Sequence, residues 1–122
     1  MEVEPLGDDF EDNCARFLPE SAGQGCVWAL EGDQGFALCE SEKYPQTEVV
    51  PFWSQREFAE IHASDDWADY RVAAIDLEEF MDDWLTGMHE DVLLVGINWN
   101  SALEGIELEP LDLLEQLEKA LQ

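Results

Sequence analysis

Residues 75–99 read IDLEEFMDDWLTGMHEDVLLVGINW, and their pattern predicts a helix followed by a strand. Apolar side chains in its first part recur at helical spacing and form one stripe, which consists of Leu77, Phe80, Met81, Trp84, Leu85 and Met88. Asp76 and Glu79 have the spacing of a capping box at the start of this helix, and Gly87 suits its C-terminal cap. Residues 91–99 form the most apolar segment, which predicts a strand at the centre of a sheet.

The predicted helix also carries four carboxylates, Glu78, Glu79, Asp82 and Asp83, that fall largely off the apolar stripe. Clustered carboxylates serve as metal ligands, as acid–base pairs in catalysis, or simply as a solvated helix face. Like charges four residues apart, as in the pair Glu78–Asp82, each cost about 0.2–0.5 kcal/mol. Because the four side chains point away from the predicted core, we interpret them as a solvated face and as a candidate surface for a partner.

The composition is dominated by acidic residues. The 122 residues include 30 Asp and Glu against 5 Lys and Arg, which gives a formal net charge of −25. A chain of this length fits one domain, so we expect residues 1–122 to form a single domain. A protein surface with this excess of negative charge repels nucleic acid and anionic lipid. The few cations are scattered singly along the sequence and form no basic patch. We therefore expect neither nucleic acid nor a membrane as a partner.

The N-terminal half is expected to contain a helix, a hairpin and a strand. The helix spans 8–21, with Asp8 or Asp9 as its N-cap and Pro19 at its end, followed by a loop over 21–25. Short apolar runs at 26–30 and 35–39 predict the hairpin. Residues 47–53 predict a third strand, which ends at Pro51 or lies at a sheet edge because proline lacks a ladder donor.

A second helix is expected over 54–63. Ser54 and Glu57 have the spacing of a capping box at its start. Phe58 and Ile61 are expected to point inward.

The remaining elements complete an α+β fold. Residues 71–75 predict a strand, and 102–110 predict a hairpin partner for the central strand. Pro110 begins a last helix. Its expected inner side consists of Leu111, Leu114, Leu117 and Leu121. We expect one mixed, mainly antiparallel sheet of about five or six strands with about four helices packed on it.

No familiar catalytic or metal-binding motif is present in the sequence. Cys14, Cys26 and Cys39 are odd in number and lack CxxC spacing, so reduced, buried thiols are expected. Phosphate-binding glycine motifs, GxSxG and HExxH are missing, and the acids lack EF-hand spacing. We therefore assign no catalytic, cofactor-binding or metal-binding residue and expect no cofactor.

Trp53 and Trp67 flank the second helix, and His62 lies at its end. Core packing explains these rings most simply. The alternative is a pocket near Trp53, His62 and Trp67, since exposed aromatic rings supply much of the energy at binding sites. That alternative would make the protein a small enzyme or a ligand-binding protein.

The sequence shows no apolar run of the roughly 20 residues that a membrane span needs. Its N-terminus, MEVEPLGDDF, has neither the positive start nor the apolar stretch of a signal peptide. We therefore expect a cytoplasmic protein.

Several segments together resemble a known family. They are GFALCESE at 35–42, VVPFWSQREFAE at 49–60, DDWADY at 65–70, IDLEEFMDDWLTGM at 75–88 and DVLLVGINWN at 91–100. In this order they are similar to a bacterial family catalogued as domain of unknown function 2750, over most of the chain. The resemblance implies a compact α+β domain of the bacterial cytoplasm and brings no established activity or catalytic residues. The chain is more acidic than the family at large, which points to a salt-adapted source or a specialised surface.

Three functional hypotheses follow from the sequence. The leading one is a non-enzymatic interaction or regulatory domain that presents Glu78, Glu79, Asp82 and Asp83 to a basic protein, as immunity proteins and inhibitors do by analogy. The second is the pocket near Trp53, His62 and Trp67. The third is a salt-adapted domain whose acidity has no bearing on function. The sequence leaves the oligomeric state open.

Overall fold

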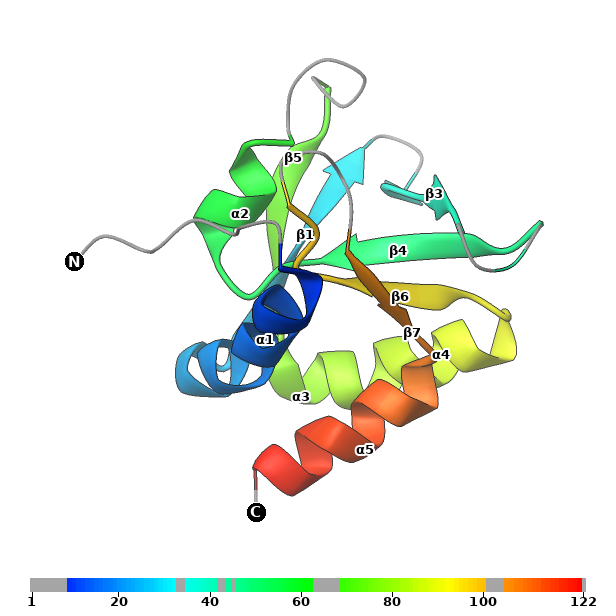
Figure 1. Ribbon diagram of the computed structural model, residues 1–122. Coiled ribbons are helices and arrows are strands. Elements are labelled where there is room, and N and C mark those ends of the chain that lie inside the picture. The colour runs from blue at the N-terminus through cyan, green and yellow to red at the C-terminus, as the bar shows by residue number, and fades with distance from the viewer. Residues whose placement is uncertain are drawn as a thin grey trace.

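The computed structural model describes residues 9–32, 35–41, 44, 46–62, 69–100 and 105–121. These residues form two sheets (Figure 1). The first has the strand order β2-β1-β5 and consists of β1 (Cys26–Gly32), β2 (Gly35–Phe36) and β5 (Arg71–Asp76). The second has the order β3-β4-β6-β7 and consists of β3 (Cys39–Glu40), β4 (Glu48–Phe52), β6 (Leu94–Ile97) and β7 (Ile106–Leu108). The helical segments are α1 (Phe10–Gln24), α2 (Arg56–Glu60), α3 (Leu77–Glu79), η2 (Phe80–Trp84), α4 (Leu85–Glu90) and α5 (Pro110–Ala120).

The helices cover the sheets unequally (Figure 1). α1, the helix formed by α3, η2 and α4, and α5 lie on one side, where they enclose the main core. The fully buried side chains of this core include Phe17, Phe52, Phe80, Val95 and Leu117. α2 lies on the other side, where Phe58 packs with Trp53 in a smaller cluster.

The expected α+β class is confirmed, with strands that pair mostly antiparallel. β4 and β6 instead run parallel in the middle of the second sheet. The described strands divide into two sheets where the sequence predicts one. The two sheets meet at Trp28 and Trp53, whose backbone N–H groups each donate to the other residue's carbonyl oxygen at 2.8 Å.

Several predicted strands are confirmed. β1 and β2 form the expected hairpin, although Cys39 lies in β3 of the other sheet. β6 is buried along its whole length and pairs antiparallel with β7, as expected of the central strand. Residues 101–104 of the predicted β6–β7 hairpin lie outside the described residues. In the parts of the chain that the structure describes, no helix combines the length and the apolar character needed to cross a membrane.

Pro51 lies inside β4, so the predicted strand end or edge position is wrong. β4 continues to Phe52 and lies between β3 and β6. Successive residues in a strand direct their N–H groups to alternate neighbours. Phe52 faces β6, because its carbonyl accepts from Asn98 N–H at 3.0 Å. Pro51 therefore faces the other side, where β3 has already ended at its pair with Val49, and no ladder donor is needed there.

α1 continues through Pro19, so the predicted helix end and the predicted loop over 21–25 are wrong. Proline removes one backbone donor, but the next turn is packed against the protein, as the full burial of Ser21 shows. The helix ends at Gly25, whose φ of 77° is left-handed and whose N–H donates to Ser21 O at 2.8 Å. Asp9 caps the other end, as predicted, by accepting from Asp12 N–H at 3.1 Å.

The predicted helix after β5 is confirmed as α3, η2 and α4 in direct succession. Asp76 caps it by accepting from Glu79 N–H at 3.4 Å. The predicted stripe packs on the core, with Leu77, Phe80, Leu85 and Met88 buried and Met81 and Trp84 partly buried. η2 is a π-helical segment that the sequence does not predict. In it, Leu85 N–H donates to the carbonyl of Phe80, five residues earlier.

This helix passes Gly87, so the predicted cap at that glycine is wrong. Val92, beyond the helix end, has a left-handed φ of 59°. Leu93 N–H donates to Met88 O at 2.9 Å, and Val92 N–H donates to His89 O at 3.2 Å. These two bonds make a Schellman motif, in which glycine usually takes the left-handed position. A β-branched valine in that conformation is strained.

α2 is shorter than the helix predicted over 54–63. It begins at Arg56, and the preceding residue Gln55 makes no side-chain capping bond. Phe58 is buried as predicted, whereas Ile61 is 55% exposed, so its predicted inward position is wrong. Ile61 lies beyond the last helical residue, where the helical spacing used for the prediction no longer applies.

α5 begins at Pro110 as predicted, and its predicted inner side is confirmed in part, since Leu117 is buried and Leu114 packs partly buried against the core. Leu113 and Leu117 are buried, whereas Leu111 and Leu121 are exposed. The helix carries two overlapping leucine stripes. Its packing against α1 and α4 selects the stripe through Leu113.

Candidate functional site

The four carboxylates singled out in the sequence lie on the outer side of the helix formed by α3 and η2. Glu78, Glu79, Asp82 and Asp83 are all exposed, while Phe80 between them is fully buried. We call these four residues the acidic face. The predicted solvated position is therefore observed, and the π-helical turn of η2 carries Asp82 and Asp83.

Ion pairs of the described cations all lie away from the acidic face. Arg16 pairs with Glu20 at 2.8 Å, Arg56 with Glu60 at 2.5 Å, and Arg71 with Glu31 at 3.8 Å. Lys119 lies 3.2 Å from Glu115, four residues earlier on α5. Within the described residues, the carboxylates of the acidic face therefore have no ion-pair partner of opposite charge.

Acidic side chains are not confined to this face. Exposed carboxylates also lie on α1, β4, α2 and α5, for example Glu11, Glu48, Glu57 and Glu118. Among the described residues, no group of three or more His, Cys, Asp or Glu side chains is placed to hold a metal ion. The acidic face is thus distinguished by four exposed carboxylates on one helix that are not paired with any described cation, and not by acidity alone.

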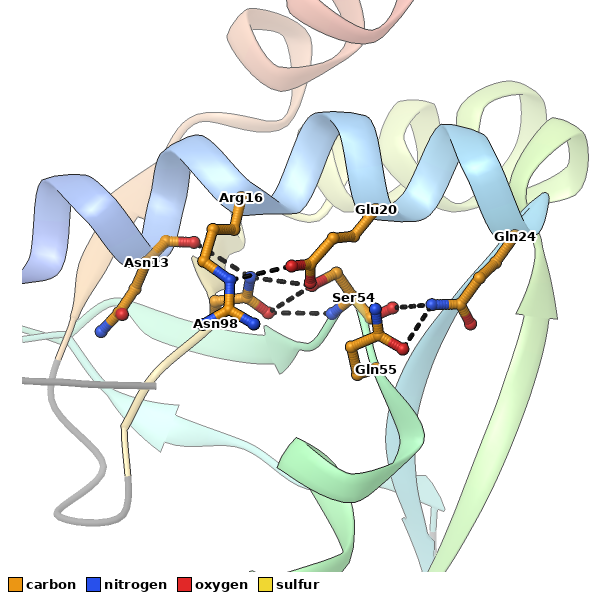
Figure 2. Close-up of polar contacts among 7 residues, drawn as sticks. All are labelled: Asn13, Arg16, Glu20, Gln24, Ser54, Gln55 and Asn98. Carbon is orange, nitrogen blue, oxygen red and sulfur yellow. Dashed lines mark hydrogen bonds and ion pairs between the residues drawn. The ribbon is translucent and has the colours of Figure 1, made fainter. Parts of the chain in front are cut away.

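A buried polar network lies at the carboxyl ends of the parallel strands β4 and β6 (Figure 2). Asn98 follows β6 and is fully buried, as is Ser54 after β4. The Asn98 Oδ1 accepts from Ser54 N–H at 2.8 Å, and its Nδ2 donates to Ser54 Oγ at 2.9 Å and to Asn13 O at 3.0 Å. Asn98 therefore joins both strand ends to α1.

The network continues along α1 toward the surface (Figure 2). Ser54 Oγ donates to Glu20 Oε1 at 2.5 Å, and Glu20 also pairs with Arg16. Gln24 Nε2 donates to Ser54 O at 2.8 Å and to Gln55 Oε1 at 2.6 Å. Because the Ser54 hydroxyl is engaged with α1, the predicted capping box of Ser54 and Glu57 is wrong.

Open α/β sheets bind ligands outside the carboxyl ends of their parallel strands, so a ligand site would be expected at this position. Here α1 covers that end, and the amide of Asn98 and the hydroxyl of Ser54 bond to each other and to α1. The network therefore attaches α1 to the sheet. Sequence reasoning missed it, and the available signal is Asn98 directly after the central strand, because asparagine tolerates the left-handed φ of 45° found there.

The aromatic residues of the predicted pocket lie partly in the core. Trp53 is fully buried, and its Nε1 donates to Trp99 O at 2.9 Å. The His62 ring stacks on Trp53 with 5.1 Å between centroids, and burial lowers the pKa of His62. Trp67 lies outside the described residues. A pocket that includes Trp67 stays a prediction.

The cysteines are free, half-buried thiols. Burial raises the pKa of Cys14 and Cys26, and it raises the pKa of Cys39 to about 11. A nucleophilic cysteine needs the opposite, a lowered pKa that provides thiolate near neutral pH. The electrostatic surroundings of these thiols therefore do not favour cysteine catalysis.

Comparison with known proteins assigns a family. The model of the family described as "Protein of unknown function (DUF2750)" matches residues 14–117. A search among curated proteins found no match. The matched range contains the acidic face together with Ser54 and Asn98 of the buried network. The chain therefore belongs to the DUF2750 family of proteins of unknown function.

Proposed function

We propose that the chain is a protein-interaction domain whose acidic face binds a basic surface of a partner protein. The observation that carries this proposal is the run of exposed carboxylates along one helix, to which no described cation is paired. Lysine and arginine side chains of a partner would supply the missing positive charges. Complementary charge raises the association rate and excludes acidic competitors.

Two further features support the proposal. The net charge of −25 attracts a basic protein over distances of about a Debye length, roughly 8–10 Å at moderate salt. π-Helical turns such as η2 frequently occur at functional positions. By analogy with immunity proteins and inhibitors, binding would mask a basic site of the partner and so regulate it.

We propose the bacterial cytoplasm as the site of action. The resemblance of the sequence to a bacterial family supports the source, and the free thiols suit a reducing compartment.

The test is capture of a basic protein from a bacterial lysate by two charge variants. One variant carries Glu78→Lys, Asp82→Lys and Asp83→Lys on the acidic face. The matched control carries Glu48→Lys, Glu57→Lys and Glu118→Lys, which change the net charge equally on exposed positions of β4, α2 and α5.

We expect the wild-type chain and the control to retain the same basic protein, and the acidic-face variant to lose it. Equal retention by both variants would remove the acidic face as the binding surface. Equal loss from both would show that net charge, and not this helix, governs the capture.

A second candidate is a salt-adapted domain whose acidity has no role in binding. The spread of exposed carboxylates over α1, β4, α2 and α5 favours this alternative. Under this alternative, neither charge variant should differ from the wild-type chain in the specific capture of a basic protein.

A further inference from the structure

Two hollows open beside the C-terminal end of α4, and Leu93 lines both of them. The first, of about 410 Å³, is lined by Phe36, Leu38 and Trp84 among others. The second, of about 370 Å³, includes Val92 in its lining. Because they share Leu93, the two hollows form one uneven surface that runs from the segment after β2 to the start of β6.

This surface exposes large apolar side chains. Leu38 is 45% exposed and Tyr44 51%, and Val92 reaches 75%. We call Leu38, Tyr44, Trp84, Val92 and Leu93 the apolar surface. Val92 is held outward in a strained left-handed conformation, although it is too exposed to contribute to the core. Backbone strain that the core does not need concentrates at functional positions.

Carboxylates border the apolar surface. Asp83 and Asp91 line the first hollow, and Glu109 lines the second. All three are exposed, and Asp83 also belongs to the acidic face. An apolar contact area is therefore continuous with the charged surface already described. His89 also lines the second hollow.

We infer that this surface binds a segment of the basic partner in which an apolar side chain is flanked by lysine or arginine. This inference rests on the proposed function and adds the recognition chemistry. The apolar side chain would fill a hollow and supply affinity, while the cations would meet Asp83 and Asp91 and set the orientation. A second copy of the chain does not suit this surface, because both copies carry a net charge of −25 and the same border of carboxylates.

The test uses two short synthetic peptides and isothermal calorimetry at a fixed NaCl concentration. One peptide has a leucine–tryptophan pair between lysine pairs, and the other has serines in place of leucine and tryptophan. We expect the apolar peptide to bind about tenfold more tightly, which is the scale of one buried apolar side chain.

Leu38→Ser and Val92→Asn should each weaken binding of the apolar peptide about tenfold and leave the serine peptide unchanged. Ile61→Ser is the matched control, because Ile61 is 55% exposed but lies next to α2, on the other side of the sheets. It should change neither peptide. Amide shifts on binding should concentrate at residues 36–38 and 83–93.

Three outcomes would overturn the inference: equal binding of the two peptides, no response to Leu38→Ser and Val92→Asn, or shifts centred on the hollow that Met81 and Leu121 line on the other flank of the helix. The variant with Glu78→Lys, Asp82→Lys and Asp83→Lys distinguishes failure of this inference from failure of the proposed function. If it weakens both peptides while the apolar variants have no effect, only the inference falls. If it changes neither peptide, the proposed function falls as well.

Discussion

Asn98 is the residue that most directly holds the fold together at one point. Its side chain bonds to Ser54 and to the carbonyl of Asn13, and thereby connects β6, β4 and α1. All of these groups are buried, so water cannot replace a lost bond. The backbone of Asn98 also has a positive φ that few other residues adopt easily.

Asn98→Ala should lower the free energy of unfolding by about 3–5 kcal/mol, because it strands buried groups and places alanine in a left-handed conformation. Chemical denaturation measures this change. Gln24→Ala is the control, since Gln24 makes similar bonds at the exposed rim of the network and its loss should cost less than about 1 kcal/mol. Equal losses for the two variants would contradict the role given to Asn98.

Val92 presents the opposite case, a residue that weakens the fold. Val92→Asn should raise the free energy of unfolding by about 1 kcal/mol, because asparagine adopts the left-handed position of the Schellman motif more readily than valine. Denaturation with an unchanged m-value would measure this gain.

Gly25→Ala provides the converse control for Val92. Gly25 has the same kind of left-handed backbone at the end of α1, and nothing lies within 4 Å of an added Cβ. Alanine there should therefore cost about 1–2 kcal/mol through conformation alone. Suppose that Gly25→Ala lowers the free energy of unfolding but Val92→Asn leaves it unchanged or lowers it. That result would show that Val92 is not strained.

At the scale of elements, the pairing of β3 with β4 places Glu40 directly opposite Glu48. Both side chains are exposed, and like charges opposite each other in a sheet repel. Glu48→Lys should turn this repulsion into attraction and raise the free energy of unfolding by about 0.5–1 kcal/mol at low salt. The gain should shrink when NaCl is added, whereas a gain that does not depend on salt would point to a cause other than charge.

Elements could be predicted from the sequence where one local pattern dominates. The stripe from Leu77 to Met88 is one such case, because only one face of that helix is apolar enough to pack on the core. The apolar run of β6 is another, because a strand without polar positions must be buried on both faces. α5 carries two leucine stripes, and only its neighbours in the fold determine that Leu113 and not Leu111 is buried. Pro19 and Pro51 misled for a similar reason, since the burial of the turn after Pro19 and the end of β3 before Pro51 appear only in the folded chain.

The candidate site likewise has one part that could be predicted from local sequence and two parts that could not. The exposed position of Glu78 and Asp82 follows from helical periodicity alone. The apolar surface does not, because Leu38, Trp84 and Val92 come from separate segments that meet only in the folded chain. The buried network is also non-local, because Ser54 and Asn98 are 44 positions apart in the sequence.

At the scale of the whole molecule, the net charge of −25 should make stability depend on salt. The melting temperature should rise from low to high NaCl, because ions screen repulsion among the carboxylates. The variant with Glu48→Lys, Glu57→Lys and Glu118→Lys, which is less negative, should show a smaller rise. A melting temperature that stays constant or falls would mean that self-repulsion does not limit stability.

If the acidic face is the contact with a basic protein, the association of the two should depend on its charges. Stopped-flow mixing with the captured partner, over a range of NaCl concentrations, measures this association. We predict that the association rate of the wild-type chain falls steeply with salt, and that Glu78→Lys, Asp82→Lys and Asp83→Lys together remove most of that dependence. Rates and salt dependence identical in the two proteins would contradict it.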